Sequence, residues 1–169
     1  MMTEQASNPE AALVQYADGP AQLEAAIAGL AEAGLDAALS ADSWSIRQIV
    51  HHIADGDDIW KICIKVALGN SQGVFHLQWY WDIPQDTWAE KWHYAGRAIE
   101  PSLALFRANR CHVVQLMQQV SESWERHALL KQHDGREMEI TVGEVIKIQV
   151  EHVVQHVNDI RAIRQAHHI

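Results

Sequence analysis

The hydrophobic positions of this chain recur mainly at intervals of three and four residues, the spacing of an amphipathic helix. A first long helix is predicted over Pro20 to Gly34, because proline suits the first turn of a helix. A shorter helix over Pro9 to Ala17 precedes it, and the turn-forming run Asp18-Gly19-Pro20 is expected to separate the two. Residues Leu35 to Ala41 are interpreted as a connector.

A second long helix is predicted from Ser45 to about Leu68. Ser45 and Gln48 match the capping box, in which each side chain bonds the backbone amide of the other residue. The pair Gly69-Asn70 then supplies a stop signal. Apolar residues occupy two adjacent stripes of this segment, so we expect the helix to be central in a bundle.

The middle of the chain is rich in aromatic residues. Residues Ser71 to Pro84 contain the run Trp79-Tyr80-Trp81 and are interpreted as a long aromatic crossover without regular structure, a functional lid or interface material. A capping pattern predicts a short helix over Thr87 to His93, and Pro101 is expected to open the third long helix.

Two short extended pieces and a final helix are predicted at the end of the chain. Residues Trp124 to Ile140 hold the turn-forming run His133-Asp134-Gly135. Thr141 and Glu144 match a second capping box and begin a helix that reaches Ile163. The inward face of this helix is predicted to comprise Val145, Ile148, His152, His156, Asp159 and Ile163.

These elements together predict an all-α fold, a four-helix bundle with a long aromatic crossover and a short hairpin before the last helix. At 169 residues and 48% hydrophobic content, the chain is expected to form a single domain over residues 1–169, with residues 1–8 flexible. Such a chain buries a sufficient core without a metal or a disulfide.

Composition excludes several partners. The net charge of −9, without a run of Lys and Arg, argues against nucleic-acid binding. No stretch of about 18 apolar residues is present, so no membrane span is expected. Cys63 and Cys111 lack the spacing of a disulfide framework or zinc knuckle, and the first ten residues do not resemble a signal peptide. A cytoplasmic location is predicted.

Candidate chemistry begins with His152 and His156, which stand four residues apart and therefore share one face of a helix, where they can hold one metal ion. In a chain with 11 histidines, ordinary hydrogen-bonded residues are the alternative. Val153 occupies the position of the glutamate in the H-E-x-x-H motif, so a thermolysin-like peptidase is disfavoured.

Three segments in order resemble the DinB-like superfamily, in particular its YfiT-type branch of metal-dependent hydrolases. They are WSIRQIVHHIAD from Trp44, SESWERHALL around Trp124, and EHVVQHVNDIRAIR from Glu151. The resemblance extends from about Leu13 to Arg164. It implies a four-helix bundle with an up-down-down-up course.

The same resemblance implies a divalent metal, nickel or zinc, held by His52, His152 and His156. His52 is expected to point inward, with Gly56 one turn later leaving room beside it. Three neutral nitrogens leave a coordination position for water, as in catalytic sites. A bound metal activates water for hydrolysis or binds a thiol as thiolate.

Three functions therefore remain open. The first is a metal-dependent hydrolase of a small-molecule substrate. The second is a thiol S-transferase that uses a low-molecular-weight thiol such as bacillithiol or mycothiol, an activity that the resemblance also implies. The third, from another class, is a non-catalytic metal- or ligand-binding stress protein. The aromatic crossover further predicts a homodimer, since exposed Trp-rich surface tends to be covered by a partner.

Two carboxylates are candidate catalytic residues. Asp159 lies one turn after His156, where it can orient a ligand ring, accept a proton, or be solvated, the interpretation that we favour. The family often has Gln at this position. Asp55 follows His52 by three residues and is either a partner of the site or a surface carboxylate. Arg110 interrupts an apolar stripe and is expected to snorkel from its edge, with binding of a substrate carboxylate as the alternative.

The remaining candidates receive no role at the site. His51 points about 100° away from His52 on a helix, and Cys63 lies about 16 Å further along its axis. No function is predicted for the other histidines, which are His76, His93, His112, His127, His133, His167 and His168.

Overall fold

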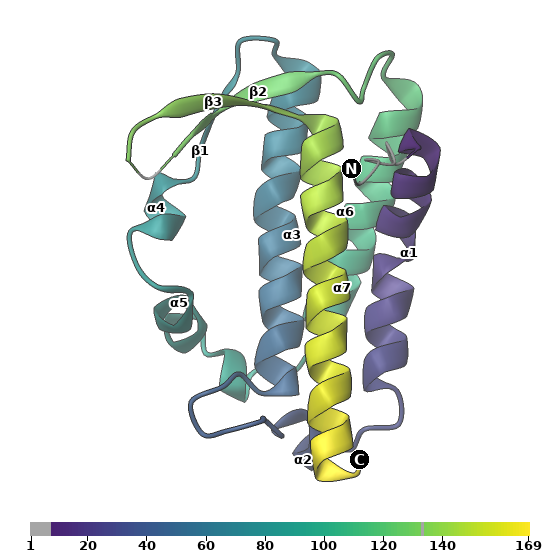
Figure 1. Cartoon of the computed structure of the whole chain (residues 1–169), viewed down its shortest axis with the longest axis vertical. Coiled ribbons are helices and arrows are strands. Elements are labelled where there is room, and N and C mark those ends of the chain that lie inside the picture. Colours follow the sequence, from purple (N-terminus) through teal and green to yellow (C-terminus); the bar gives the residue numbers. More distant parts are fainter. Residues whose placement is uncertain (1–7, 133) are drawn as a thin grey trace, which may run out of the picture.

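Four long helices pack side by side in a computed structural model that describes residues 8–132 and 134–169 (Figure 1). They are α1 (Pro9–Ile27), α3 (Ile46–Gly69), α6 (Glu100–Gln119) and α7 (Val142–His167). In Figure 1, α1 and α7 run downward, whereas α3 and α6 run upward. The parallel course of α3 and α6 follows from the long crossover between them. The predicted four-helix bundle with up-down-down-up topology is confirmed.

Helix α1 continues through Pro20, so the turn predicted at this residue is wrong. Proline has no N–H, and the carbonyl of Tyr16, four residues earlier, therefore lacks its helical donor. Arg110 Nη1 donates to this carbonyl at 2.8 Å and replaces the missing bond. Gly19 makes room for the arginine, since a Cβ atom there would lie 2.9 Å from Nη1.

The predicted end of the first helix at Gly34 is also wrong. Helix α1 ends at Ile27, Gly29 adopts a left-handed conformation with φ of 77°, and residues Glu32–Leu35 form the separate short helix α2. At the other end, the side chain of Asn8 accepts from the amide of Glu10 and caps α1. Flexibility was predicted for residues 1–8; residues 1–7 lie outside the described residues, and Asn8 is the cap of α1.

Both predicted capping boxes are present, and they fix where α3 and α7 begin. Ser45 Oγ accepts from the amide of Gln48, and Gln48 Oε1 accepts from the amide of Ser45. Thr141 and Glu144 are paired in the same way. These local patterns therefore set the register of the two helices that carry the candidate site.

The crossover contains short regular elements. The sequence interpretation missed β1 (Val74–His76), α4 (Gln78–Trp81) and the 3₁₀ helix η1 (Tyr94–Gly96), whereas the helix predicted over Thr87 to His93 corresponds to α5 (Gln85–Lys91). Strand β1 pairs in parallel with β2 (His127–Lys131), which pairs antiparallel with β3 (Glu137–Thr141). The predicted hairpin before α7 is thus confirmed, although His133 of its turn lies outside the described residues.

The buried face of α7 differs from the predicted stripe. Ile148 is 42% exposed, whereas Gln149, Val153 and Val157 are buried. Helix α7 packs against both α1 and α3 (Figure 1), so its buried face is broad and centred away from Ile148. The predicted stripe included His152 and His156 as inward residues. Both are in fact half-buried and lie at the edge of the observed buried face. No helix in the described part of the chain is both long and apolar enough to cross a membrane.

Candidate metal centre

Three histidines that are distant in sequence meet between α3 and α7. His52 comes from α3, and His152 and His156 come from α7. One ring nitrogen from each lies within 4.8 Å of the others, and the Nε2 atoms of His52 and His152 are 2.9 Å apart. The three ring centroids are separated by 4.7 to 4.9 Å. Among the described residues, this group alone has the composition and proximity to hold a metal ion.

The neighbouring residues fix the position of these rings. A Cβ atom on Gly56 would lie 3.5 Å from Cε1 of His152, so the ring fits against the backbone of α3 at ordinary contact distance. The indole of Trp44 meets His52 edge-on at 4.6 Å between ring centroids. Trp44 is itself held by a 2.6 Å hydrogen bond from Nε1 to Asp86 Oδ1.

Burial keeps the three rings uncharged. It lowers the pKa of His52 to about 3, and the neighbouring histidines act in the same direction. Burial likewise lowers the pKa of His152 to about 4. The pKa of His156 is also lowered by burial, although its hydrogen bond with Asp159 opposes the shift. At neutral pH all three are therefore neutral imidazoles, the form that binds metals.

The geometry fits a divalent metal. Nitrogens that bind one tetrahedral zinc at 2.0–2.1 Å are about 3.4 Å apart. The separations here, from 2.9 Å to at most 4.8 Å, bracket that value. His152 Nδ1 is buried without a hydrogen-bond partner in the part of the chain that the structure describes. A buried, uncharged set of nitrogens that face one another is complete only with a shared cation or proton.

Asp159 contacts the histidine group from its solvent side. Its Oδ2 atom accepts from Nδ1 of His156 at 3.0 Å, while its side chain remains 46% exposed. A carboxylate that accepts from the outer nitrogen of a histidine orients the ring and leaves Nε2 for a metal. The favoured expectation of a solvated carboxylate did not include this contact.

Asp55 faces a different part of the molecule. Its Oδ2 atom lies 4.0 Å from Nη1 of Arg97, at the end of the crossover. Burial and the nearby Asp55 raise the pKa of Tyr94. Asp55 is not a member of the metal-capable group among the described residues. The structure thus places it beside η1, near Tyr94 and Arg97.

Arg110 does not snorkel, because its side chain is only 1% exposed. Its Nε atom donates to Asp57 Oδ1 at 2.8 Å, and Nη2 donates to the carbonyl of Gln149 at 3.0 Å. The guanidinium also stacks on the ring of Tyr16 at 3.9 Å. Its donors are therefore engaged within the bundle. The sequence analysis missed Asp57, which is one of three aspartates in the run Asp55-Gly56-Asp57-Asp58 of α3.

Other residues that were set aside have structural positions. His51 is fully buried and joins α3 to α6, with Nδ1 at 2.8 Å from Ser102 Oγ and Nε2 at 3.3 Å from the carbonyl of Arg97. Cys63 is buried in the core, and burial raises the pKa of its thiol to about 12. Cys111 is exposed, and both cysteines are free.

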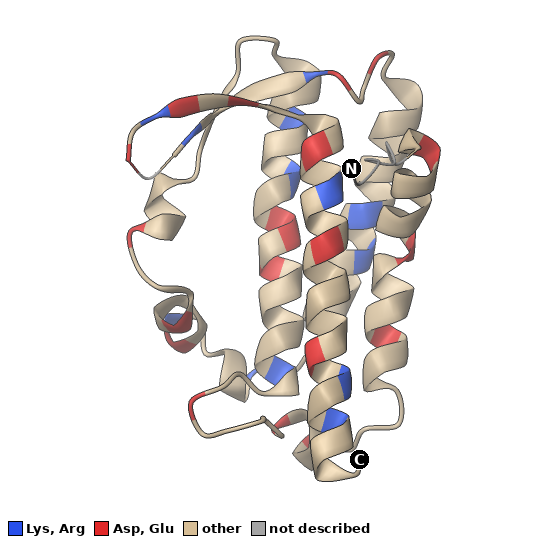
Figure 2. Ribbon diagram, viewed as in Figure 1, with Lys and Arg blue, Asp and Glu red and all other residues tan. Residues whose placement is uncertain are grey.

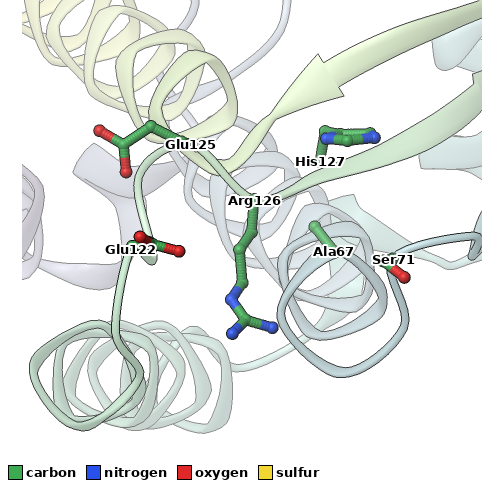
Figure 3. A pocket seen from close by; sticks show the side chains of 6 residues that line it. All are labelled: Ala67, Ser71, Glu122, Glu125, Arg126 and His127. Atoms are coloured by element: carbon green, nitrogen blue, oxygen red, sulfur yellow. The ribbon is translucent and has the colours of Figure 1, made fainter.

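A cavity of about 250 Å³ opens beside the histidine group. Its walls include His156 and Asp159 of α7 together with Leu39, Trp44, Ile49 and Ile163. A second cavity of about 250 Å³ lies near the other end of α3 (Figure 3). There the side chains of Glu125 and His127 point to opposite sides, and Arg126 caps the carbonyl of Leu68 at 3.1 Å. Only the first cavity adjoins residues that can hold a metal.

Comparisons with known proteins identify the family of this chain. The family model of the DinB superfamily matches residues 15–160. A protein of Bacillus licheniformis named "putative metal-dependent hydrolase" is 26% identical over 148 residues, which cover 86% of this chain and 79% of that protein. A protein of Oceanobacillus iheyensis with the same description is 25% identical over 146 residues, 86% of this chain and 80% of its own.

A solved structure shares the fold. YfiT from Bacillus subtilis, described as "a probable metal-dependent hydrolase with an unusual four-helix bundle topology", superposes with a TM-score of 0.79 at 20% identity. The match covers 98% of this chain and 91% of that one. With the family model spanning most of the chain, the fold and the sequence lead to one conclusion: this protein belongs to the DinB superfamily.

Proposed function

We propose that the protein is a divalent-metal-dependent hydrolase of a small molecule, with His52, His152 and His156 as the metal ligands. The observation that carries the proposal is the convergence of three neutral imidazoles, one buried and two half-buried, beside a cavity of about 250 Å³. The names of the two curated relatives support a metal-dependent activity. Imidazole ligands suit both zinc and nickel, and we propose either as the metal.

The residues of the chain have separate parts in this proposal. A divalent metal, when bound, supplies Lewis-acid activation of water or of a substrate oxygen. The three histidines bind it, and Asp159 acts as a positioning residue through its hydrogen bond to His156. Leu39 and Trp44 form walls against which a substrate packs. Asp55, which faces the crossover, is left as the weaker candidate for proton transfer.

Metal content tests the ligand assignment. The purified parent protein is expected to bind about one equivalent of zinc or nickel, and His152→Ala is expected to lower the affinity at least about 100-fold. His112→Ala is the matched control, because His112 is exposed on α6 and has no part in the group. Equal metal uptake by the parent and His152→Ala would refute the assignment.

Hydrolysis is tested separately with the metallated protein. A panel of esters and amides is expected to include a substrate that is cleaved by the metallated parent but not by the chelator-treated parent or by His52→Ala. If a fully metallated sample cleaves nothing and also conjugates no thiol, the non-catalytic metal-binding alternative takes the place of the hydrolase.

A thiol S-transferase is the alternative catalytic function, because a coordination position that admits water also admits a thiolate. Cobalt in place of the native metal gives a direct test. Binding of a low-molecular-weight thiol to the metal would produce a sulfur-to-cobalt charge-transfer band in the near ultraviolet. A band with saturating thiol would favour the transferase, and an unchanged spectrum would favour the hydrolase.

We further propose a homodimer that uses the crossover. Tyr80 stacks on both Trp88 and Trp92, whereas the neighbouring Trp79 is 48% exposed. Covering such a ring with a second copy would remove apolar surface from water. Light scattering at micromolar concentration is expected to give the mass of a dimer for the parent and of a monomer for Trp79→Ser. A monomeric parent would overturn this proposal.

The proposed location is the cytoplasm. Cys111 is an exposed free thiol, which persists in a reducing compartment. Fractionation of cells that express the full chain is expected to recover it with cytoplasmic enzymes, and recovery with the membranes or the medium would contradict this.

A further inference from the structure

The cavity beside His156 is lined mainly by hydrophobic side chains. Four of its lining side chains, Leu39, Trp44, Ile49 and Ile163, are hydrophobic, and they surround the side of the histidine group that carries Asp159. Trp44 connects the cavity to the histidine group, because its indole lines the cavity and packs edge-on against His52. A molecule bound in this cavity therefore lies directly beside the proposed metal position.

The charge of the cavity has one sign. Asp159 is the only formally charged residue of its lining, and none of the described lining residues is Lys or Arg. The arginines of neighbouring segments are occupied elsewhere. Arg47 is paired with Glu32 and Asp36, and Arg164 donates to the carbonyls of Ala26 and Ala28.

The charge of the whole protein has the same sign as that of the cavity. Lysine and arginine are scattered over several helices and the hairpin, and they do not gather into one patch (Figure 2). With a net charge of −9, the protein as a whole attracts cations and repels anions. An anionic group that entered the cavity away from the proposed metal position would lose water and meet Asp159 without a lysine or arginine of the lining to pair with, which is costly in an apolar site.

From these observations we infer that the cavity selects uncharged or cationic substrates with a small apolar group, and that it rejects substrates with an anionic group at this position. The inference rests on the proposed function, because it places the apolar group beside a metal on the three histidines. A volume of about 250 Å³ lies below the range of about 300–1,000 Å³ of sites for drug-sized ligands, so the group must be small.

Three probes built on one carbon chain test the inference on the full metallated protein. They are hexanohydroxamic acid, its ω-amino analogue and its ω-carboxy analogue, which share a metal-binding head and differ in the charge of the tail. Calorimetric titration is expected to show similar affinities for the neutral and cationic probes and an affinity at least about tenfold lower for the anionic probe.

Two substitutions at one exposed position provide matched controls. Leu39 is 57% exposed and contacts the cavity without belonging to the histidine group, so its replacement spares the fold and the metal. Leu39→Lys is expected to reduce the discrimination against the anionic probe several-fold, and Leu39→Glu to increase it. Equal binding of the three probes by the metallated parent, together with no effect of Leu39→Lys, would overturn the inference.

The outcomes separate the inference from the proposed function. A chain that binds metal and hydroxamates but does not discriminate by charge retains the proposed function and loses the inference. A chain that takes up no metal at this site loses both.

Discussion

Two buried polar clusters lie in the same bundle and differ in how their polar atoms are paired. In the first, Arg110 and Asp57 are each 1% exposed, and the guanidinium donates to the carboxylate and to the carbonyls of Tyr16 and Gln149. In the second, the nitrogens of the three histidines face one another, and His152 Nδ1 has no partner within the described residues. The first cluster pairs a positive side chain with a negative one, whereas the three rings of the second are uncharged.

This difference distinguishes a structural cluster from a candidate functional one. Arg110 joins α1, α3, α6 and α7 through bonds that use its donors, so a further ligand would have to displace a bond that already exists. In the histidine group, the Nε2 atoms of His52 and His152 contact each other at 2.9 Å, and burial disfavours the additional protons that would charge the rings. Each cluster retains a buried atom without a partner among the described residues, Asp57 Oδ2 in the first and His152 Nδ1 in the second. The clusters differ because the first contains its own cation, the Arg110 guanidinium, whereas the second consists of neutral rings.

The largest expected effect is on the first cluster. Arg110→Met would leave the Asp57 carboxylate and the Tyr16 carbonyl buried without their donor, at a cost of about 3–5 kcal/mol in the free energy of unfolding. Urea unfolding measures the change. The double variant Arg110→Met with Asp57→Leu is expected to recover part of this loss, because it removes the unpaired charge. A loss below about 1 kcal/mol in the single variant would show that the cluster is not the structural anchor described here.

Lowering the pH should act on the second cluster. In the unfolded chain a histidine has a pKa near 6.5, whereas burial holds the pKa of His52 at about 3 and of His152 at about 4 in the folded, metal-free protein. Between these values the unfolded chain binds protons that the folded chain excludes, so the free energy of unfolding falls as the pH falls. From about pH 7.5 to about pH 5, the expected loss is about 1–2 kcal/mol for each of these rings.

The control for this slope must account for Asp57. Burial raises the pKa of Asp57 to about 6, against the effect of Arg110, so this carboxyl takes up a proton in the folded state and opposes the slope. His152→Leu retains Asp57 and removes one ring, and its slope in urea unfolding is expected to be shallower than that of the parent. Identical slopes in the two proteins would exclude the histidine group as the cause.

Asp159→Asn should have a smaller effect that is confined to the metal. The substitution removes the charge that orients and supports His156, and the expected loss of zinc affinity is about tenfold. The stability of the metal-free protein should change by less than about 0.5 kcal/mol, because the residue is partly exposed. Glu151→Gln, an exposed acid on the same helix, is the control and should retain the affinity of the parent. Equal affinity in Asp159→Asn would remove its positioning role.

The sequence could predict features that depend on neighbouring residues, and it missed those that depend on distant ones. Capping boxes at Ser45 and Thr141 are contiguous patterns, and both were predicted at the correct residues. The grouping of the three histidines followed from a local spacing together with a family resemblance. By contrast, Pro20 suggested a break because its compensating donor, Arg110, lies 90 residues away in sequence, at a distance that no local pattern reports.

Strand β1 and the face of α7 were missed for related reasons. A strand of three residues such as β1 has no period of its own and exists through its parallel pairing with Leu129, Leu130 and Lys131. On α7, counting the histidines as inward residues rotated the predicted stripe toward Ile148. At the edge of a buried face, polar and apolar residues alternate without a clear period. Side chains at such an edge can also line a cavity.

The smallest expected effect provides the sharpest test of the comparison. His152→Leu replaces a buried ring whose Nδ1 atom lacks a partner with a hydrocarbon side chain, so in the presence of a chelator it is expected to raise the free energy of unfolding by about 1 kcal/mol. His152→Gln retains buried polar atoms and should give no such gain, although both variants lose the metal. Urea unfolding of the three metal-free proteins decides the matter. A destabilised His152→Leu would mean that the ring contributes to the fold as Arg110 does, and the two clusters would then be alike.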